Sequence, residues 1–389
     1  MERKQILVIG MFDSIHLARW LKQFENTAVD FKLFPSKKFK YINLELIKLL
    51  NLDSKASYKL AQPYYQYKLI GYFDFLICKI GNLFNINVKL LLLTRSLSKN
   101  TFDFVHAIEI QGAGYMYLEL PLNIKNQNFL ILTNWGSDIF FFQKDPMHNS
   151  KISKILNLAS YYSAECERDY KLLKNYDFKG KLLPCIPNGG GFSDKEFNSN
   201  GYLTSDRALI VCKGYGGKFG RADLSIPAIE NILKKYSIFR VFFYSVTKDV
   251  EERIIDLAKK YEGRVDYSVV SKPISHNLLM QLFKEARVYI GCSECDGIST
   301  SFLEAIVNGA YPIQTNTSCV NEWADKGIKC SIVGLNVNEI TMELERVIVD
   351  KDFLDDAQKT NFYIASLTLS NSIVNPIAHQ FYGLTPPRL

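Results

Sequence analysis

Two carboxylates, Asp296 and Glu304, lie eight positions apart in the stretch SECDGISTSFLEAI, which spans residues 293–306. The preceding segment ARVYIGCS is an apolar run typical of a buried strand, and TSFLEAIVNG has the pattern of a helix that Gly309 closes. A helix start after a strand presents free backbone N–H groups and the positive end of the helix dipole, and both favour a phosphate. The stretch therefore predicts an anion site flanked by two acids.

The residues around this helix start suit contact with a phosphorylated, hydroxyl-rich ligand. Gly297 lets the backbone approach a ligand closely, and Ser299 and Thr300 can cap the helix or donate to ligand oxygens. Glu304 lies one turn into the helix, where one carboxylate can accept hydrogen bonds from both hydroxyls of a ribose. Asp296, at the end of the strand, suits the hydroxyls of a sugar ring. The spacing alone fits an N-capped helix with an incidental acid equally well.

A second stretch, CKGYGGKFGRAD at residues 212–223, places Lys213, Lys218 and Arg221 among four glycines. It ends an expected strand and leads into an expected helix, the place where sheets of this kind bind ligands. Glycine-rich backbone with cations can cradle a phosphate, although the spacing is not that of a Walker motif. The alternative is an exposed basic loop with no ligand.

Apolar runs alternate with helical patterns along most of the chain, which favours parallel sheets covered by helices on both faces. We expect strands at residues 6–10, 102–110, 128–136, 207–214, 239–246, 286–293 and 311–317. We expect helices at residues 16–24, 151–175, 224–236, 250–261, 276–286 and 300–309.

The segment 181–206, rich in proline, glycine, asparagine and serine, is the best domain boundary in the chain. We therefore expect an N-terminal Rossmann-like domain over residues 1–190 and a C-terminal one over 200–368. A C-terminal helix over 369–389 is expected to cross back to the first domain. With two parallel sheets facing across a cleft, the ligand site would lie beyond the carboxyl ends of the strands.

Length and composition fit an intracellular globular protein. The chain has 389 residues, which suits two domains, and 47% hydrophobic residues. MERKQILVIG runs directly into an expected strand without a signal peptide, and no apolar run is long enough to span a bilayer. We expect a cytoplasmic protein. The eight cysteines are scattered, and Cys292 and Cys295 have no second pair at the spacing of a zinc site.

Residues 32–99 carry 12 Lys and Arg against three acids, interleaved with aromatic residues. Such a segment can contact an anionic membrane surface, which would place the protein peripherally on the inner face of the cell membrane. The alternative is a solvated basic surface. Nucleic acid is not an expected partner, because no DNA- or RNA-binding motif is present.

Taken together, these stretches resemble the retaining glycosyltransferases of family four. Asp296, seven residues and Glu304 in DGISTSFLEAIVNGAYPI resemble the E-x7-E signature of that family, with Asp296 for its first glutamate and Ile298-Ser299 for Phe-Gly. Glu294, two residues earlier, competes with Asp296 for the role of that glutamate. DSIHLARW, FDFVHA, NWGSDIF, PNGGGF and VSKPISHNLLMQLFKEARVYIGCS resemble further family motifs in the same order, so the likeness runs from about residue 5 to about residue 350.

The resemblance implies the GT-B fold of two Rossmann-like domains. It also implies transfer of a sugar from a nucleoside-diphosphate sugar to a glycan, lipid-linked or similar hydroxyl acceptor, with retention at the anomeric carbon. Such enzymes of the bacterial envelope serve cell-surface polysaccharide synthesis. The resemblance implies no metal ion, since no DxD motif appears, no cofactor beyond the donor itself, and no dedicated protein base.

By the same resemblance, Glu304 binds the ribose and Asp296 the sugar hydroxyls, and Lys213 with Lys218 or Arg221 stabilises the leaving diphosphate. The donor-binding set implied in full is Asp296, Gly297, Ile298, Ser299, Thr300 and Glu304, with Ser14 and His16 on the first strand–helix loop. His106 matches a histidine near the donor sugar, although a lone histidine at a strand end is equally a structural residue. Asp138 of the GSD turn binds acceptor or caps the next helix.

Three other protein classes were weighed. A dehydrogenase needs GxGxxG directly after a strand, and IGMFDSIH lacks it. A GT-B sugar-nucleotide epimerase needs its own acid and base, which the sequence does not locate. A non-catalytic GT-B scaffold subunit is compatible with Asp296 and with Ile108, where some family members have a second histidine.

Overall fold

The structure is a computed structural model that describes residues 3–39, 41–61, 70–83, 86–197 and 203–384. The chain divides into two compact units, each with its own hydrophobic core. Unit 1 comprises Met1–Gly191 together with Ser372–Leu389, and unit 2 comprises Phe192–Asn371. Each unit is described by itself.

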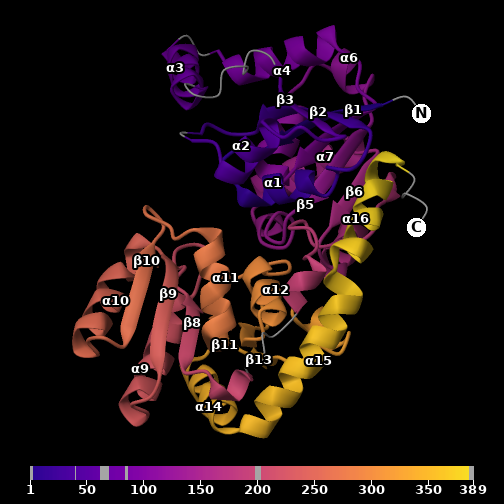
Figure 1. The fold of residues 1–389 in the computed structure, drawn as a ribbon. Coiled ribbons are helices and arrows are strands. Elements are labelled where there is room, and N and C mark those ends of the chain that lie inside the picture. Colours follow the sequence, from indigo (N-terminus) through magenta and orange to yellow (C-terminus); the bar gives the residue numbers. More distant parts are fainter. Residues whose placement is uncertain (1–2, 40, 62–69, 84–85, 198–202, 385–389) are drawn as a thin grey trace. The chain divides into compact units, whose positions relative to one another are not determined.

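Unit 1 is built on a parallel sheet, which in the described residues has seven strands in the order β3-β2-β1-β4-β5-β6-β7 (Figure 1). The interior strand β1 carries the run ILVIG, which is buried on both faces, as expected for a parallel strand between helices. The strands are β1 Lys4–Gly10, β2 Val29–Pro35, β3 Ser57–Leu60, β4 Phe104–Ile108, β5 Leu130–Asn134, β6 Tyr161–Ala164 and β7 Lys181–Leu182.

The helices of unit 1 include one that comes from the far end of the chain. The helices are α1 Ile15–Lys22, α2 Leu44–Leu50, α3 Ile70–Leu83, α4 Val88–Lys99, α5 Tyr115–Leu118, α6 Leu122–Lys125, α7 Pro146–Leu158, α8 Glu167–Leu172 and α16 Asn371–His379. Val374, Phe381 and Tyr382 of the C-terminal segment belong to the core of unit 1. Trp20 Nε1 donates to the Tyr382 hydroxyl at 3.2 Å, which ties this segment to α1.

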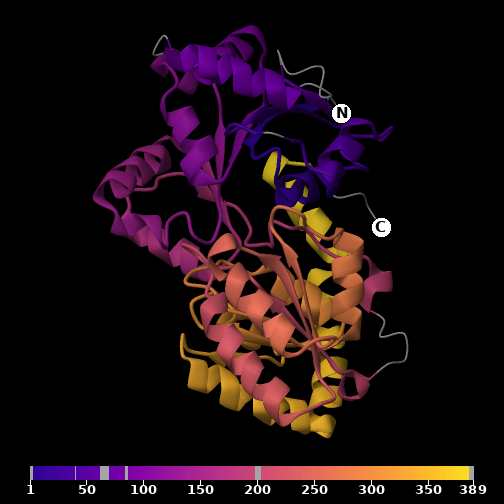
Figure 2. The same ribbon diagram turned by 90° about the vertical axis from the view of Figure 1, so that its left-hand side faces the viewer.

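Unit 2 has a parallel sheet of six described strands in the order β10-β9-β8-β11-β12-β13, with helices in front of it in the view of Figure 2. The strands are β8 Leu209–Lys213, β9 Arg240–Val246, β10 Val265–Val269, β11 Ala286–Gly291, β12 Tyr311–Thr315 and β13 Ser331–Val333. The helices are α9 Ala222–Lys235, α10 Lys248–Lys260, α11 His276–Glu285, α12 Thr300–Val307, α13 Asn321–Ala324, α14 Val337–Val349 and α15 Lys351–Leu369.

The expected fold class, two α/β domains with parallel sheets, is confirmed. The helix expected over 151–175 is wrong, because α7 ends at Leu158 and β6 follows at Tyr161–Ala164. The backbone of β6 pairs with β5 and β7, and its Tyr162 is fully buried, so sheet pairing overrides the helical pattern of the flanks. Among the described residues, no helix combines the length and the apolar character that crossing a bilayer requires.

Candidate functional site

The two stretches singled out in the sequence follow neighbouring strands of unit 2. Lys213 ends β8 and Gly291 ends β11, and these strands pair in parallel at the centre of the sheet. The chain continues from β8 outward to β9 and β10, and then returns to place β11 on the other side of β8. This reversal is the topological switch point, where α/β sheets bind ligands beyond the carboxyl ends of their strands.

Backbone hydrogen bonds join the two loops. Gly220 and Ser293 form an antiparallel bridge, Arg221 N donates to Cys292 O at 3.0 Å, and Glu294 N donates to Phe219 O at 2.7 Å. Gly220 is required at this junction, since a Cβ there would lie 1.9 Å from the Tyr215 carbonyl oxygen. The structure thus brings the cation-rich loop and the acid-rich stretch into one local assembly.

The glycine amides of the cation-rich loop are not the phosphate donors that the sequence suggested. Gly216 N donates to Thr247 Oγ1 at 2.8 Å and Gly217 N to Asp249 Oδ2 at 2.7 Å. Gly214 N and Gly220 N donate to backbone carbonyls. The hydroxyl of Thr247 holds the pKa of the Asp249 carboxyl below its usual value, so this acid is a charged acceptor at neutral pH. The glycines therefore shape the loop, and its cations are what it can offer to an anion.

The three cations of this loop differ in their surroundings. Arg221 is fixed by a two-bond fork to Asp223, at 3.0 and 3.1 Å, and by a third bond from Nη1 to Glu294 Oε2 at 3.1 Å. The Asp223 carboxylate raises the pKa of the Arg221 guanidinium above its ordinary value. Lys213 Nζ lies 5.6 Å from the Tyr215 ring centroid and makes no ion pair within the part of the chain that the structure describes. Lys218 Nζ lies 5.5 Å from the ring of the adjacent Phe219.

The helix α12 begins at Thr300, directly after the acid-rich stretch. Its N-cap residue, Ser299, gives the helix no side-chain cap, although the sequence allowed for one. Ser299 contributes its carbonyl instead, which accepts from Phe302 N at 3.0 Å. Ile298 and Ser299 are buried, whereas Asp296 and Thr300 are half-buried. A helix start without a side-chain cap suits an anion, because no side chain of the N-cap residue competes for its first amides.

Glu304 lies one turn into α12 and is buried, with a partner that the sequence did not reveal. His276 Nε2 lies 2.8 Å from Glu304 Oε1. His276 is the first residue of α11, which its N-cap Ser275 opens by accepting from Leu278 N at 3.2 Å. The sequence could have indicated His276 by one feature: it begins a helix that follows a strand of the same sheet. In that position a side chain lies at the same sheet edge as the start of α12.

In unit 1, His106 is a core residue, as the structural alternative for a lone histidine expects. It lies in the central strand β4 and is fully buried. Its Nδ1 lies 2.7 Å from the Tyr382 hydroxyl and its Nε2 lies 2.6 Å from Thr133 Oγ1, so both ring nitrogens are engaged. Burial lowers the pKa of His106 to about 3, and the imidazole is therefore neutral at ordinary pH.

Asp138 holds two loops of unit 1 together rather than capping the next helix. Its buried Oδ2 accepts from Ile110 N at 2.8 Å and from Trp135 N at 3.0 Å, and so joins the loops that follow β4 and β5. Burial, with the nearby Glu109 carboxyl, raises the pKa of Asp138 well above its usual value. Glu109 adopts a φ of 82°, unusual for a residue with a side chain, and accepts from Ala113 N at 2.8 Å.

Ser14 and His16 lie on the loop between β1 and α1. Ser14 Oγ accepts from His16 N at 3.2 Å and caps α1. The His16 ring lies edge-on to Trp135, with 5.7 Å between the ring centroids. The structure thus gathers the loops after β1, β4 and β5 at one edge of the sheet of unit 1, and it leaves Ser14 and His16 half-buried there.

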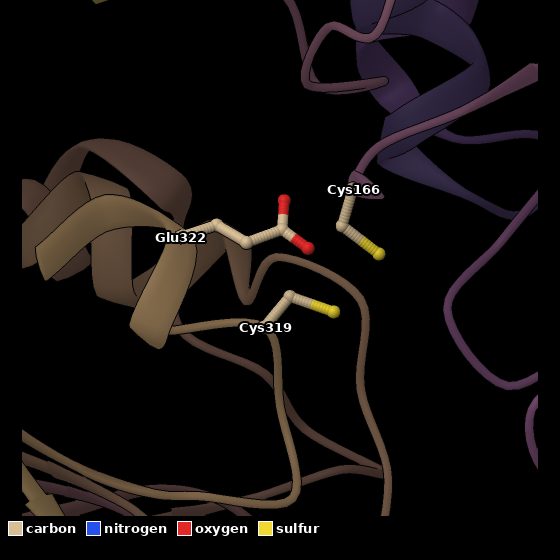
Figure 3. A group of neighbouring side chains, drawn as sticks. All are labelled: Cys166, Cys319 and Glu322. Carbon is tan, nitrogen blue, oxygen red and sulfur yellow. The ribbon is translucent and has the colours of Figure 1, made fainter. Parts of the chain in front are cut away.

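All eight cysteines are free thiols, and the Cys292–Cys295 pair forms no disulfide. Figure 3 draws Cys166, which belongs to unit 1, with Cys319 and Glu322, which belong to unit 2. Within unit 2, Glu322 N donates to Cys319 O at 3.2 Å, a backbone bond at the start of the short helix α13.

No protein-family model and no curated protein sequence matches the chain. Solved structures do match over nearly its whole length. HepE from Anabaena in complex with UDP-glucose has a TM-score of 0.69 at 12% identity, over 98% of this chain and 100% of that chain. The sucrose-phosphate synthase of Thermosynechococcus elongatus has a TM-score of 0.68 at 13% identity, over 97% of each chain.

A TarM variant from S. aureus, solved with fondaparinux, alpha-GlcNAc-glycerol and UDP, has a TM-score of 0.69 at 11% identity, over 98% of this chain and 100% of that chain. At such low identities a likeness establishes architecture and not chemistry. With its two parallel-sheet α/β units and these neighbours, the chain has the GT-B fold.

Proposed function

We propose that this protein is a glycosyltransferase that moves a sugar from a nucleoside-diphosphate sugar to a hydroxyl group of a glycan or lipid-linked acceptor, in cell-surface polysaccharide synthesis. One observation carries the proposal. The cation-rich loop after β8 and the acid-rich stretch after β11 are joined by backbone bonds at the switch point of unit 2. Structural neighbours solved with UDP-glucose or UDP give the proposal further support.

Each part of the donor then has a complement in unit 2. Glu304 would accept hydrogen bonds from the ribose hydroxyls, and Asp296 would bind hydroxyls of the sugar ring. The uncapped start of α12 and the ammonium groups of Lys213 and Lys218 would face the diphosphate. Arg221 would add a positive charge. Its side chain is already fixed by Asp223 and Glu294, so donor binding would not have to immobilise it.

The chemistry follows from this placement of charge. As the bond between the anomeric carbon and the diphosphate oxygen breaks, negative charge gathers on the leaving group, where preorganised cations stabilise it most. In the retaining reaction the acceptor hydroxyl attacks from the same face. Its oxygen forms the new bond to the anomeric carbon, and its proton passes to an oxygen of the departing diphosphate. The protein's residues therefore bind and orient, and the proposed reaction is independent of metal.

A screen of donors against thermal unfolding tests the proposal. The panel contains UDP-glucose, UDP-galactose, UDP-N-acetylglucosamine, GDP-mannose and ADP-glucose, with UDP, GDP and ADP alongside. A donor at 100 times its Kd stabilises the folded state by about 2.7 kcal/mol, which should raise Tm by about 5 °C or more. Lys213→Ala should lose most of this shift, and Lys235→Ala, a surface lysine paired with Glu345, should keep it.

The selected donor is then incubated with the protein and with acceptor extracts. Release of nucleoside diphosphate that depends on the acceptor supports a transferase. Inversion of the sugar at its second carbon without an acceptor would instead identify an epimerase. Tight donor binding with neither reaction would identify a scaffold subunit. If no nucleotide sugar in the panel raises Tm, the proposal is wrong at its first step.

A further inference from the structure

Helix α3 of unit 1 presents apolar side chains to solvent and a charged one to the protein. Leu76, Ile80 and Leu83 are 54%, 47% and 75% exposed, whereas Asp74 and Cys78 are buried. Spacings of four and three residues place the exposed side chains on one helical face, and Lys79, also exposed, lies among them. We call Leu76, Lys79, Ile80 and Leu83 the outer face of α3. Among the side chains of α3 that the structure describes, the polarity is the reverse of that of an ordinary surface helix.

This orientation is fixed by contacts on the opposite side of the helix. Asp74 Oδ1 pairs with Lys89 Nζ of α4 at 3.2 Å, and both side chains are buried. Phe39 N donates to Asp74 Oδ2 at 3.4 Å. Near the end of the helix, a Cβ on Gly81 would lie 2.6 Å from the Ile86 carbonyl oxygen, so Gly81 packs closely against Ile86. Rotating α3 until its exposed aliphatic side chains faced the protein would break the buried ion pair between Asp74 and Lys89, which is strongly unfavourable.

The exposed charges within residues 70–99 have one sign. Residues 70–99 contain four cations and one acid, and that acid is the buried Asp74. Lys79, Arg95 and Lys99 are exposed on the two helices. The segment that donates to Asp74 continues into Tyr41, which is also exposed, and amphipathic side chains of this kind suit a membrane interface. A second copy of the chain would bring like charges together, whereas an anionic surface complements them.

We propose that the outer face of α3 docks on the surface of a bilayer that contains anionic lipid. The three aliphatic side chains would enter the boundary between headgroups and acyl chains, and the neighbouring lysines and arginine would contact lipid phosphates. The helix lies in the interface and does not cross the membrane. This inference does not depend on the proposed glycosyl transfer, because it concerns residues of unit 1 outside the assembly at β8 and β11.

Co-sedimentation of the full chain with vesicles tests the proposal. Vesicles of phosphatidylcholine alone are compared with vesicles of phosphatidylcholine and phosphatidylglycerol at three to one, in 50 mM and 500 mM salt. We expect binding to the anionic vesicles that weakens at high salt, and little binding to the neutral ones. Lys79→Glu should lower the partition coefficient by about fivefold or more. Leu76→Ser with Ile80→Ser and Leu83→Ser should lower it by about tenfold or more.

The matched control replaces exposed apolar residues elsewhere, Met342→Ser with Val349→Ser on α14 of unit 2, and should bind as the wild type does. Thermal unfolding of each variant confirms that its fold is intact. Failure of the wild type to sediment with anionic vesicles overturns the proposal, as does wild-type binding by the triple serine variant. Light scattering provides the remaining check, because a dimer that the triple variant abolishes would identify a second copy as the occupant of this face.

Discussion

The pair formed by Glu304 and His276 gives the sharpest prediction about the proposed donor site. Glu304 is buried on α12, and His276 Nε2 of α11 lies 2.8 Å from its Oε1. Replacing the carboxylate by its amide, Glu304→Gln, keeps the shape and leaves an oxygen that can still accept from the histidine. The free energy of unfolding should therefore change by less than about 1 kcal/mol, because no cavity forms and the bond to the histidine is kept.

Donor binding should respond far more strongly than stability. Hydrogen bonds to a charged group contribute about 1.5–3 kcal/mol each, compared with about 1 kcal/mol for neutral pairs. The amide also offers one acceptor oxygen where the carboxylate offers two for the ribose hydroxyls. The combined loss is about 3 kcal/mol, which corresponds to a Kd roughly 100-fold higher.

His276 acts on the same interaction indirectly, as a positioning residue. Its side chain is 33% exposed, so water can replace part of its bond to Glu304 in His276→Ala. We expect a Kd about fivefold higher, and recovery in His276→Gln, whose amide can donate to the same oxygen. A residue needed only for packing would not be rescued by this change of shape.

Isothermal titration calorimetry with UDP and UDP-glucose measures these effects, alongside denaturant unfolding of each variant. Glu285→Gln, the same substitution at an exposed position of α11, is the matched control and should bind as the wild type does. A Kd for Glu304→Gln within twofold of the wild-type value would refute the role of Glu304. If the wild type binds neither ligand, the donor does not carry UDP, and the role of Glu304 must be tested with another nucleotide.

Three further predictions concern single residues. Lys213→Ala should lower the rate of nucleoside-diphosphate release by about 100-fold, because one cation at a developing charge contributes about 3 kcal/mol. The control variant Lys235→Ala should leave that rate unchanged. Equal rates in the two variants would show that Lys213 is not part of the site. Gly220→Ala should distort the loop and abolish donor-induced stabilisation, because its Cβ would lie 1.9 Å from a backbone oxygen. Gly217→Ala, whose Cβ would lie in open space at a φ of 70°, should lower the free energy of unfolding by only about 1 kcal/mol. Calorimetry of both variants distinguishes the two effects. Burial lowers the pKa of His106 from 6.5 in the unfolded chain to about 3, so between these pH values the unfolded chain binds more protons than the folded one. The free energy of unfolding should therefore fall as the pH drops below 6.5, by up to about 1.4 kcal/mol per pH unit. In denaturant titrations at pH 4–7, His106→Gln should reduce this dependence on pH.

The alternating pattern of the chain was sufficient to predict its fold class, because buried parallel strands read as continuous apolar runs. The run in β1 and the run in β11 are of this kind. The edge strands β3 and β10 were not predicted, because their sequences are not continuous apolar runs. The strand β10, VDYSV, has two exposed residues, and β3, SYKL, is short and half-polar, so neither differs from a loop by composition. Their positions are set by pairing with β9 and β2, which a local pattern does not report.

The site residues divide along the same line. Residues at or just after the end of a strand, such as Lys213 and Asp296, were predicted because that position alone marks them. His106 lies within a strand, and its surroundings come from Thr133 on the next strand and from Tyr382, which is 276 residues away. His276 had no pattern of its own, since its partner lies on the following helix. Burial and partners that arise from distant segments decide between a core histidine and a site histidine.

The same reasoning bears on which acid takes the place of the first glutamate in the signature. Glu294 has the right side-chain length, and Asp296 has the right distance from Glu304. In the structure, Glu294 Oε2 accepts from Arg221 Nη1 at 3.1 Å, and its amide is bonded to Phe219 O, so it belongs to the junction that holds the cation-rich loop. Turning Glu294 toward a sugar would release a guanidinium that two carboxylates now fix. Asp296 lies two residues nearer to the start of α12 and is half-buried. We therefore expect Glu294→Gln to loosen the loop and weaken binding of UDP alone, and Asp296→Asn to weaken UDP-glucose while leaving UDP unchanged. The opposite pattern in calorimetry would exchange the two assignments.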